Sequence, residues 1–351
     1  MSTPTASYAG NFETPAAPAA GNRLRITAYI GALLGLALLI GLVVRADVGA
    51  MLQTLALAGW ALLWLVPYRT LYFLLYAVGW LDLLRPCDRQ RRAGLVYLVW
   101  VTSVREAIDR LLPVASVGGG VAGVRLLRWR QLPTAAVSAS VIVEILLTAC
   151  VLYLFTAIGL FLLFSLHAAG PQYRRLLVGL LCGLPLPVAA VLLLRYGSVF
   201  ARLQRLLRPL VGETALSKGA AALDRELRAS LGRGWTLLGV GSLQFVAVLS
   251  AAFEIWLVLR LCGHPVDARA ALIMESMTQA LRHIAFFIPG GLGVQEGALV
   301  VFGQVLGIGS DLALAVSMAK RLREVLCGLP ALISWQWLEG RRLRGMPRPR
   351  Y

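Results

Sequence analysis

Apolar residues occur in long runs along this chain, and polar residues gather in the shorter stretches between them. A helix of about 20 apolar residues is long enough to cross the hydrocarbon core of a bilayer. The pattern therefore predicts an all-α polytopic membrane protein with about six full spans. The predicted spans are 24–44, 59–84, 137–165, 174–195, 235–261 and 311–338.

Composition and charge placement support this class. Hydrophobic residues make up 58% of the chain and charged residues 15%, whereas soluble chains carry about 25% charged residues. The net charge of +17 comes from arginines clustered between the apolar runs, a pattern typical of cytoplasmic loops near anionic lipid and not of a nucleic-acid surface. Both termini are predicted to be cytoplasmic, in a bacterial inner membrane. The basic clusters lie at 85–92, 125–130, 202–233 and 341–350.

The ends of the chain differ from its centre. Residues 1–21 are rich in Pro, Ala, Ser and Thr, which predicts a disordered tail. A transmembrane domain is expected over 22–340, followed by a basic tail at 341–351. Within that domain, 196–233 combines basic residues with apolar positions at helical spacing, which predicts a cytoplasmic amphipathic segment.

Two stretches, 93–130 and 266–307, do not fit simple spans. By charge placement each begins and ends on one side of the membrane, and each holds an apolar helix interrupted by Pro and clustered Gly. Irregular backbone at membrane depth must be buried in protein or line a watery cavity. We therefore predict two re-entrant helical hairpins; the alternative is that Pro and Gly only kink two ordinary helices.

These two stretches resemble each other. In the segments LLPVASVGGGVAG and FIPGGLGVQEGAL, Pro113 aligns without a gap with Pro289, and Ala122 with Ala298. Repeat one is expected over about 93–165 and repeat two over about 266–338. Because the hairpins would open to opposite sides, the sequence predicts an inverted repeat, a plan that recurs in secondary transporters.

The second break, PGGLGVQEG, is the sharpest candidate site. Proline ends a helix, glycines allow the chain to reverse, and Gln295 and Glu296 then begin a half-helix whose positive dipole end favours anions. We expect a polar cavity that admits a lipid headgroup or a proton; the alternative is that Glu296 only caps its helix. The candidate substrate-binding residues are Glu296, Gln295, Arg282, His283, Gly290, Gly291, Gly293 and Glu144.

Further ionisable residues lie within apolar runs, where an unpaired charge is costly. Glu144, between two β-branched residues, is expected to have a partner in a neighbouring helix. Arg321 and Arg323 lie near a predicted outer end, so their heads are expected to reach the interface. Glu324 is expected to pair one turn back with Lys320. In the first repeat the four residues that can pair at helical spacing are Arg105, Glu106, Asp109 and Arg110.

Sequence motifs for catalysis are missing. Gly118, Gly120 and Gly123 match GxGxxG spacing, but no strand precedes them, so a flexible helix break is the better interpretation. The five cysteines are dispersed, and no metal-ligand spacing or nucleophile constellation occurs. We expect no enzyme activity, no cofactor and no bound metal.

The segments LLPVASVGGGVAGVRLL, FFIPGGLGVQEGALVVFG and KRLREVLCGLPALISWQ resemble the flippase-like transmembrane family typified by the membrane half of lysylphosphatidylglycerol synthases. The closer resemblance is to its hopanoid-biosynthesis-associated branch, over about 24–340. Two departures stand out. Gly120 occupies a position where that branch usually has Glu, and this sequence shows no soluble aminoacyl-transferase domain, so lysyl-lipid synthesis is not expected.

The resemblance implies an inner-membrane lipid transporter or flippase-like protein for a hopanoid or a related lipid. Its implied partners are membrane lipid, anionic phospholipid at the cytoplasmic face and hopanoid biosynthesis enzymes, with no nucleic acid. Two alternatives remain open: a membrane-embedded enzyme that modifies a lipid headgroup, and a scaffold for hopanoid biosynthesis enzymes held through 196–233.

Overall fold

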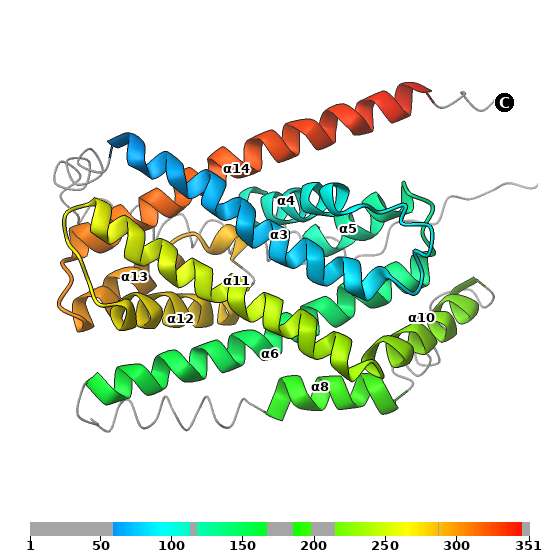
Figure 1. Cartoon of the computed structure of the whole chain (residues 1–351), viewed down its shortest axis with the longest axis horizontal. Coiled ribbons are helices and arrows are strands. Elements are labelled where there is room, and N and C mark those ends of the chain that lie inside the picture. The colour runs from blue at the N-terminus through cyan, green and yellow to red at the C-terminus, as the bar shows by residue number, and fades with distance from the viewer. Residues whose placement is uncertain (1–58, 113–117, 167–184, 198–214, 287, 346–351) are drawn as a thin grey trace, which may run out of the picture.

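The computed structural model describes residues 59–112, 118–166, 185–197, 215–286 and 288–345 (Figure 1). Within these ranges the chain is all-helical, with ten α-helices, two short 3-10 helices and no strand, which confirms the predicted class. Three helices are long and apolar enough to cross a membrane: Gly59–Leu84 (η1, Gly59–Trp64, with α3, Leu65–Leu84), α6 (Thr134–Leu166) and α11 (Gly234–Leu261).

These three helices match three of the predicted spans. The span predicted at 24–44, the first half of the span predicted at 174–195, the tail at 1–21 and the end of the basic tail lie outside the described residues. The span predicted at 311–338 falls within α14 (Ser310–Gly345), which is long enough to cross but carries several charged side chains in its middle.

The first predicted hairpin is an antiparallel pair of helices, α4 (Leu95–Leu111) and α5 (Gly118–Arg128). At its open end the hydroxyl of Tyr97 donates to the carbonyl of Leu126 at 2.7 Å. Near the turn the backbone N–H of Gly119 donates to the Asp109 carboxylate at 2.8 Å.

The sequence suggested that the glycines of VGGGVAG (117–123) form the helix break, but Gly118, Gly119, Gly120 and Gly123 lie in the first turns of α5. Two of them permit close packing instead. A Cβ atom at Gly119 would overlap the Asp109 carboxylate, and one at Gly123 would lie 2.8 Å from Cδ of Arg105. The hairpin therefore depends on small residues where α5 returns along α4.

The second hairpin pairs α12 (Ala268–Ile284) with α13 (Val294–Val305) through the short 3-10 turn η2 (Pro289–Gly291). Its tip meets the tip of the first hairpin. A Cβ atom at Gly290 would lie 2.5 Å from the carbonyl oxygen of Arg110, the next-to-last residue of α4.

The two ends of helix α14 pack on different hairpins, which shows that the open ends of the hairpins lie at opposite ends of the molecule. Its beginning packs on the open end of hairpin two, where a Cβ at Gly303 would lie 3.2 Å from Cβ of Ala313. Its far part packs on the open end of hairpin one, where the indole N–H of Trp100 donates to Ser334 at 2.8 Å. The open ends of the two hairpins therefore lie at opposite ends of the molecule, on the left and right of Figure 1, and their tips meet between them.

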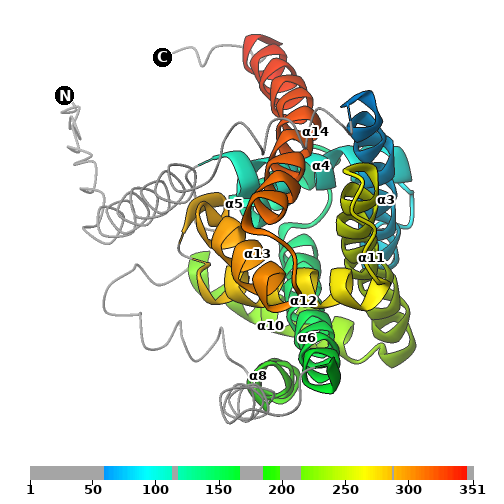
Figure 2. The same cartoon turned by 90° about the vertical axis from the view of Figure 1, so that its left-hand side faces the viewer.

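The long helices pack reciprocally around these hairpins. Helix α6, which follows hairpin one, packs along α12 of hairpin two, and α14, which follows hairpin two, packs along α4 of hairpin one. The helices that precede the hairpins, α3 and α11, lie side by side (Figure 2). The helices that precede the two hairpins thus contact each other, and the long helix that follows each hairpin contacts the other hairpin.

Two further helices, α8 (Pro185–Tyr196) and α10 (Ala215–Leu231), pack on each other and on α6. Part of the predicted amphipathic segment, 198–214, lies outside the described residues. Its remainder is α10, which buries Leu227 and Leu231 and exposes Arg225 and Arg228. This helix therefore has one face packed against the protein and one exposed basic face, whereas the apolar positions on which the sequence prediction rested lie within 198–214, outside the described residues.

The outer surface is strongly apolar. Large side chains stand exposed on all the long helices, among them Trp60, Phe161, Trp235 and Ile333, each at least 67% exposed. A soluble monomer rarely exposes so much apolar surface, whereas lipid tails solvate it. The fold thus places large apolar side chains on its surface and several charged residues inside.

Candidate functional site

The tip of hairpin two is shaped by glycines with positive φ. Gly290, Gly291 and Gly293 have φ of 62°, 61° and 73°, in a region that other L-residues rarely adopt. This backbone turns two carbonyls toward Arg321 of α14. The guanidinium Nη1 donates to the carbonyl of Gly290 at 2.9 Å, and Nη2 donates to that of Gly291 at 3.2 Å.

Glu296 lies at the centre of the site, in the first turn of α13, with no exposed surface. Its carboxylate accepts from Nε of Arg321 at 2.9 Å and from the hydroxyl of Ser317 at 3.2 Å. The dipole at the start of α13 adds positive potential. Glu296 therefore does more than cap its own helix, because it joins α13 to α14.

Gln295 and Arg282 complete the same cluster. The guanidinium of Arg282 donates to the side-chain oxygen of Gln295, and the Gln295 amide donates to Ser317 at 3.2 Å. Arg282 also lies 3.8 Å from the carboxylate of Glu324, which in turn pairs with Arg321 at 3.0 Å. We call these six residues the tip network: Arg282, Gln295, Glu296, Ser317, Arg321 and Glu324.

More buried ion pairs surround the tip network. Arg323 pairs with Glu254 of α11 at 2.7 Å, and Lys320 pairs with Glu275 of α12. Close to Arg323 and Glu324, Arg69 of α3 pairs with Glu106 of α4. Each pair joins two helices. Such charges are expensive at membrane depth unless they are paired, and here they are paired across helices.

Two sequence expectations about α14 are wrong. Arg321 and Arg323 do not extend to an interface; Arg323 is 4% exposed, and the Arg321 side chain is enclosed by the tip network. Glu324 pairs with Arg321 one turn back, not with Lys320. The sequence pattern placed these residues near the end of an apolar helix. In the structure they lie in the middle of α14, where their partners on the neighbouring helices surround them.

The first hairpin carries its own polar pair. Glu144 of α6 accepts from Nη1 of Arg105 at 2.7 Å, which is the neighbouring-helix partner that the sequence predicted. Asp109 accepts from the backbone N–H of Gly119, in place of the arginine expected at helical spacing. Glu106 and Arg110 lie 3.6 Å apart at helical spacing, as expected.

Gly120 aligns with Glu296 when the two segments are compared, and in the structure Gly120 has apolar neighbours. A Cβ atom at Gly120 would contact Val141 at 3.4 Å and Ile145 at 3.9 Å. The nearby acid of this hairpin comes instead from α4, where Asp109 meets the start of α5. In the part of the chain that the structure describes, only the second tip buries a carboxylate from its own returning helix.

His283 lies apart from the tip network. Its side chain is exposed, and Nδ1 lies 2.7 Å from the carbonyl of Gln279 on its own helix. Glu144 likewise belongs to the first hairpin. Of the eight candidate residues, the structure brings six together at one tip. Arg321, Ser317 and Glu324 are members of the tip network that were not among the candidate binding residues; Arg321 and Glu324 had been noted only as ionisable residues in an apolar run.

A small cavity of about 10 Å³ adjoins the network between α3, α4 and α14. Its lining includes Glu106, Arg110, Arg323 and Glu324, together with the thiol residue Cys327. This volume is about the space that one water molecule needs. Among the described residues, no group of three or more His, Cys, Asp or Glu side chains is placed to hold a metal ion.

Long apolar helices around a buried charged centre define an α-helical integral membrane protein. A family model described as the lysylphosphatidylglycerol synthase TM region matches residues 30–330. The chain belongs to this family, as its motifs suggested. Neither a curated protein sequence nor a solved structure matches the chain significantly.

Proposed function

We propose that this protein is a lipid transporter or flippase-like protein of the bacterial inner membrane, and not an enzyme. The observation that carries the proposal is the tip network: several charges with almost no exposed surface, held where two helical hairpins meet. Ionisable residues inside membrane domains are costly and mark substrate or ion paths.

The reciprocal packing supports an inverted repeat. In this proposal both hairpins are re-entrant, both termini are cytoplasmic, and the two tips lie near the middle of the bilayer. Broken helices at the junction of two inverted halves form the substrate sites of many secondary transporters. The contact between Gly290 and the carbonyl of Arg110 is where the two hairpin tips touch.

Glu296 and Arg321 would exchange partners during transport. Arg321 donates to two carbonyls and two carboxylates, so it holds the tip closed in the state described. A polar headgroup that bonds to Glu296, or a proton that neutralises it, would weaken its charge-assisted bond to Arg321. Release of that bond would loosen α13 from α14 and open the tip.

The lipid is proposed to be a hopanoid or a related polycyclic or polyprenyl lipid, on the family resemblance. Its headgroup would enter the tip network while its apolar body stays in contact with the exposed apolar faces of the long helices. The exposed apolar side chains of the long helices and the buried charges of the tip network support this division.

The test is Glu296→Gln, with Glu339→Gln as the control. Glu339 pairs with Arg125 near the far end of α14, away from the tips. We expect Glu296→Gln to change the distribution of the lipid between membranes in the producing organism and Glu339→Gln to leave it unchanged. An unchanged distribution with Glu296→Gln at normal protein level would remove this residue from the mechanism.

The lipid that co-purifies with the protein, identified by mass, tests the substrate. A hopanoid or polyprenyl lipid retained by the wild type and reduced in Glu296→Gln is the expected result. A lipid that the purified protein alters chemically without moving it would instead establish a headgroup-modifying enzyme.

A further inference from the structure

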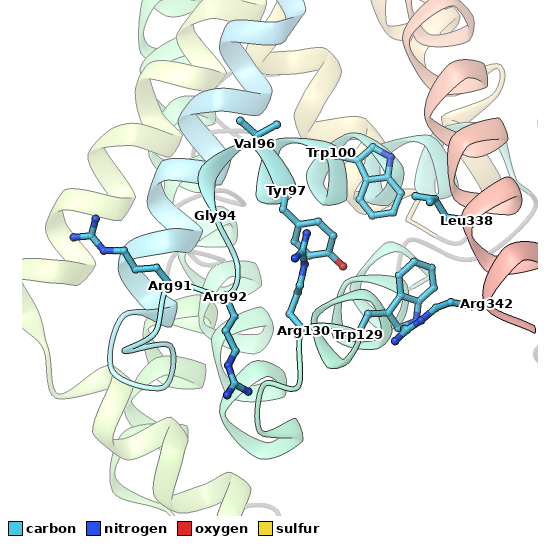
Figure 3. Close-up of a pocket in the computed structure, with 10 residues that line it drawn as sticks. All are labelled: Arg91, Arg92, Gly94, Val96, Tyr97, Trp100, Trp129, Arg130, Leu338 and Arg342. Carbon is cyan, nitrogen blue, oxygen red and sulfur yellow. The ribbon is translucent and has the colours of Figure 1, made fainter. Parts of the chain in front are cut away.

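A second feature lies at the C-terminal end of α14, far from the open end of hairpin two. It is an open pocket of about 960 Å³ between the loop after α3, the open end of hairpin one and the end of α14 (Figure 3). The tip network is not part of its lining. The pocket is therefore a separate feature at the basic end of the molecule.

The lining of this pocket is positive. Of its ten lining residues four are arginines (Arg91, Arg92, Arg130 and Arg342) and none is acidic. Among the described residues no carboxylate forms an ion pair with any of the four, and the nearby Glu339 is taken by Arg125. This contrasts with the tip network, where each charge is matched.

Aromatic rings hold two of these guanidinium groups in place. Arg130 lies over the ring of Tyr97 at 4.3 Å, and Arg342 lies over the ring of Trp129 at 4.8 Å. Stacking uses the face of a guanidinium and leaves its in-plane N–H donors free. Trp100 fixes the group of rings, with its centroid 6.4 Å from that of Trp129.

The backbone at the pocket is strained at two points. In the described residues, Arg91 (φ 50°) and Gln131 (φ 61°) are the only non-glycine residues with positive φ, and they lie in the two loops that flank the pocket. Nη1 of Arg92 donates to Gln131 at 3.2 Å and so links these loops. Such strain persists where surrounding contacts enforce it, and it clusters at binding sites.

The first of these loops is built around the buried carboxylate of Asp88. It accepts from the backbone N–H groups of Arg92 and Ala93, each at 2.8 Å. The carboxylate is thus used by the backbone and does not neutralise the pocket arginines. Arg91 and Arg92 of this loop therefore line the pocket, and no carboxylate of the described residues forms an ion pair with their side chains.

We propose that this pocket binds the phosphate of an anionic phospholipid. The phosphate would lie between Arg130 and Arg342, which both project into the pocket in Figure 3. Guanidinium groups bind phosphate oxygens in a bidentate manner. Val96, 85% exposed, and Leu338 provide apolar surface beside them for the glycerol and the start of the acyl chains.

The same chemistry fits a soluble phosphate compound, but the surroundings favour a lipid. The pocket lies at the end of the apolar helix surface, with arginines and aromatic rings together, as at a membrane interface. Phospholipid binding at this pocket requires a membrane protein but does not require transport at the hairpin tips. Either proposal, transport at the tips or binding at the pocket, can therefore be disproved without the other.

The experiment measures binding of phosphatidylglycerol to the full-length protein in phosphatidylcholine nanodiscs. The pocket variant is Arg130→Gln/Arg342→Gln. The control is Arg128→Gln/Arg341→Gln, which removes the same charge from neighbouring positions outside the lining; Arg341 also stacks on an aromatic ring, Trp337, at 4.5 Å. All four arginines are exposed, so both variants should fold.

We expect phosphatidylglycerol to bind the pocket variant about tenfold more weakly and the control variant as the wild type does. Arg130→Lys/Arg342→Lys should recover part of the loss, because lysine keeps the charge but not the bidentate geometry. Equal weakening in both glutamine variants would show diffuse attraction to anionic lipid and overturn the proposal. Displacement of the lipid by inorganic phosphate or inositol hexakisphosphate at equal concentration would overturn the lipid assignment.

Discussion

The carbonyl oxygen of Arg110 lies directly against Gly290, with room for a hydrogen at position 290 but not for a methyl group. This contact joins the end of α4 to the tip of hairpin two. Since the hairpins lie at opposite ends of the molecule, the contact is where their tips meet.

Gly290→Ala tests this contact. The substitution adds a Cβ atom 2.5 Å from that carbonyl at a residue with φ of 62°. We expect it to lower the free energy of unfolding, measured in mixed micelles, by about 1–2 kcal/mol for the positive φ and by about 1–3 kcal/mol more for the overlap.

The matched control is Gly307→Ala. Gly307 also has a positive φ, 77°, but a Cβ atom added there would have no neighbour within 4 Å. It should show only the cost of the backbone conformation. If the two variants lost the same stability, the hairpin tips would not be in close contact.

The ion pair between Arg323 and Glu254 should be costly to break from one side. Both residues are at most 4% exposed, and removal of one partner leaves a buried charge, which typically costs about 3–5 kcal/mol. We expect Arg323→Leu and Glu254→Leu each to lower the melting temperature sharply, and the double variant to recover most of that loss.

The exposed pair between Asp267 and Arg269 serves as the comparison, because each side chain is at least 65% exposed. Asp267→Asn should change stability by less than about 1 kcal/mol. A double variant of the buried pair as unstable as the sum of its single variants would indicate that Arg323 and Glu254 act independently.

The crossing of α6 and α12 depends on Gly159. A Cβ atom at this position would overlap the hydroxyl of Ser276, so Gly159→Ala should destabilise the protein by about 1–3 kcal/mol. Gly239→Ala in α11 has open space around it and should be neutral or stabilising by up to about 1 kcal/mol. Thermal unfolding of both variants in detergent provides the measurement; equal stability would place α6 farther from α12.

Much of this architecture could be predicted from local sequence. Apolar runs located the three long helices, and Pro with clustered Gly located the interruptions between α4 and α5 and between α12 and α13 to within a few residues. Gln295 and Glu296 were found because they directly follow the glycines of the second turn. These features depend only on neighbours along the chain.

The partners of buried charges could not be predicted in the same way. Lys320 pairs with Glu275, 45 residues away, and Arg321 reaches the tip glycines 30 and 31 residues away. Helical spacing suggested only the local pair of Lys320 with Glu324. His283 and Arg282 are adjacent in sequence but face different ways, since a helix turns about 100° per residue. The termini, the membrane sidedness and the lipid remain predictions.

Cysteine accessibility tests the arrangement of the hairpins most directly. In a variant without its five native cysteines, single cysteines would be placed at the two tips by Leu112→Cys and Leu292→Cys. Two more would mark the exposed open ends by Val96→Cys in hairpin one and Arg269→Cys in hairpin two. A membrane-impermeant maleimide is applied to right-side-out and to inverted vesicles.

We expect the thiol at 96 to react from the cytoplasmic side only and the thiol at 269 to react from the opposite side only. The thiols at 112 and 292 should react far more slowly from both sides, because the tips lie at membrane depth within protein. Reaction of both open ends from one side, or of both tips as fast as the open ends, would contradict this arrangement of the hairpins.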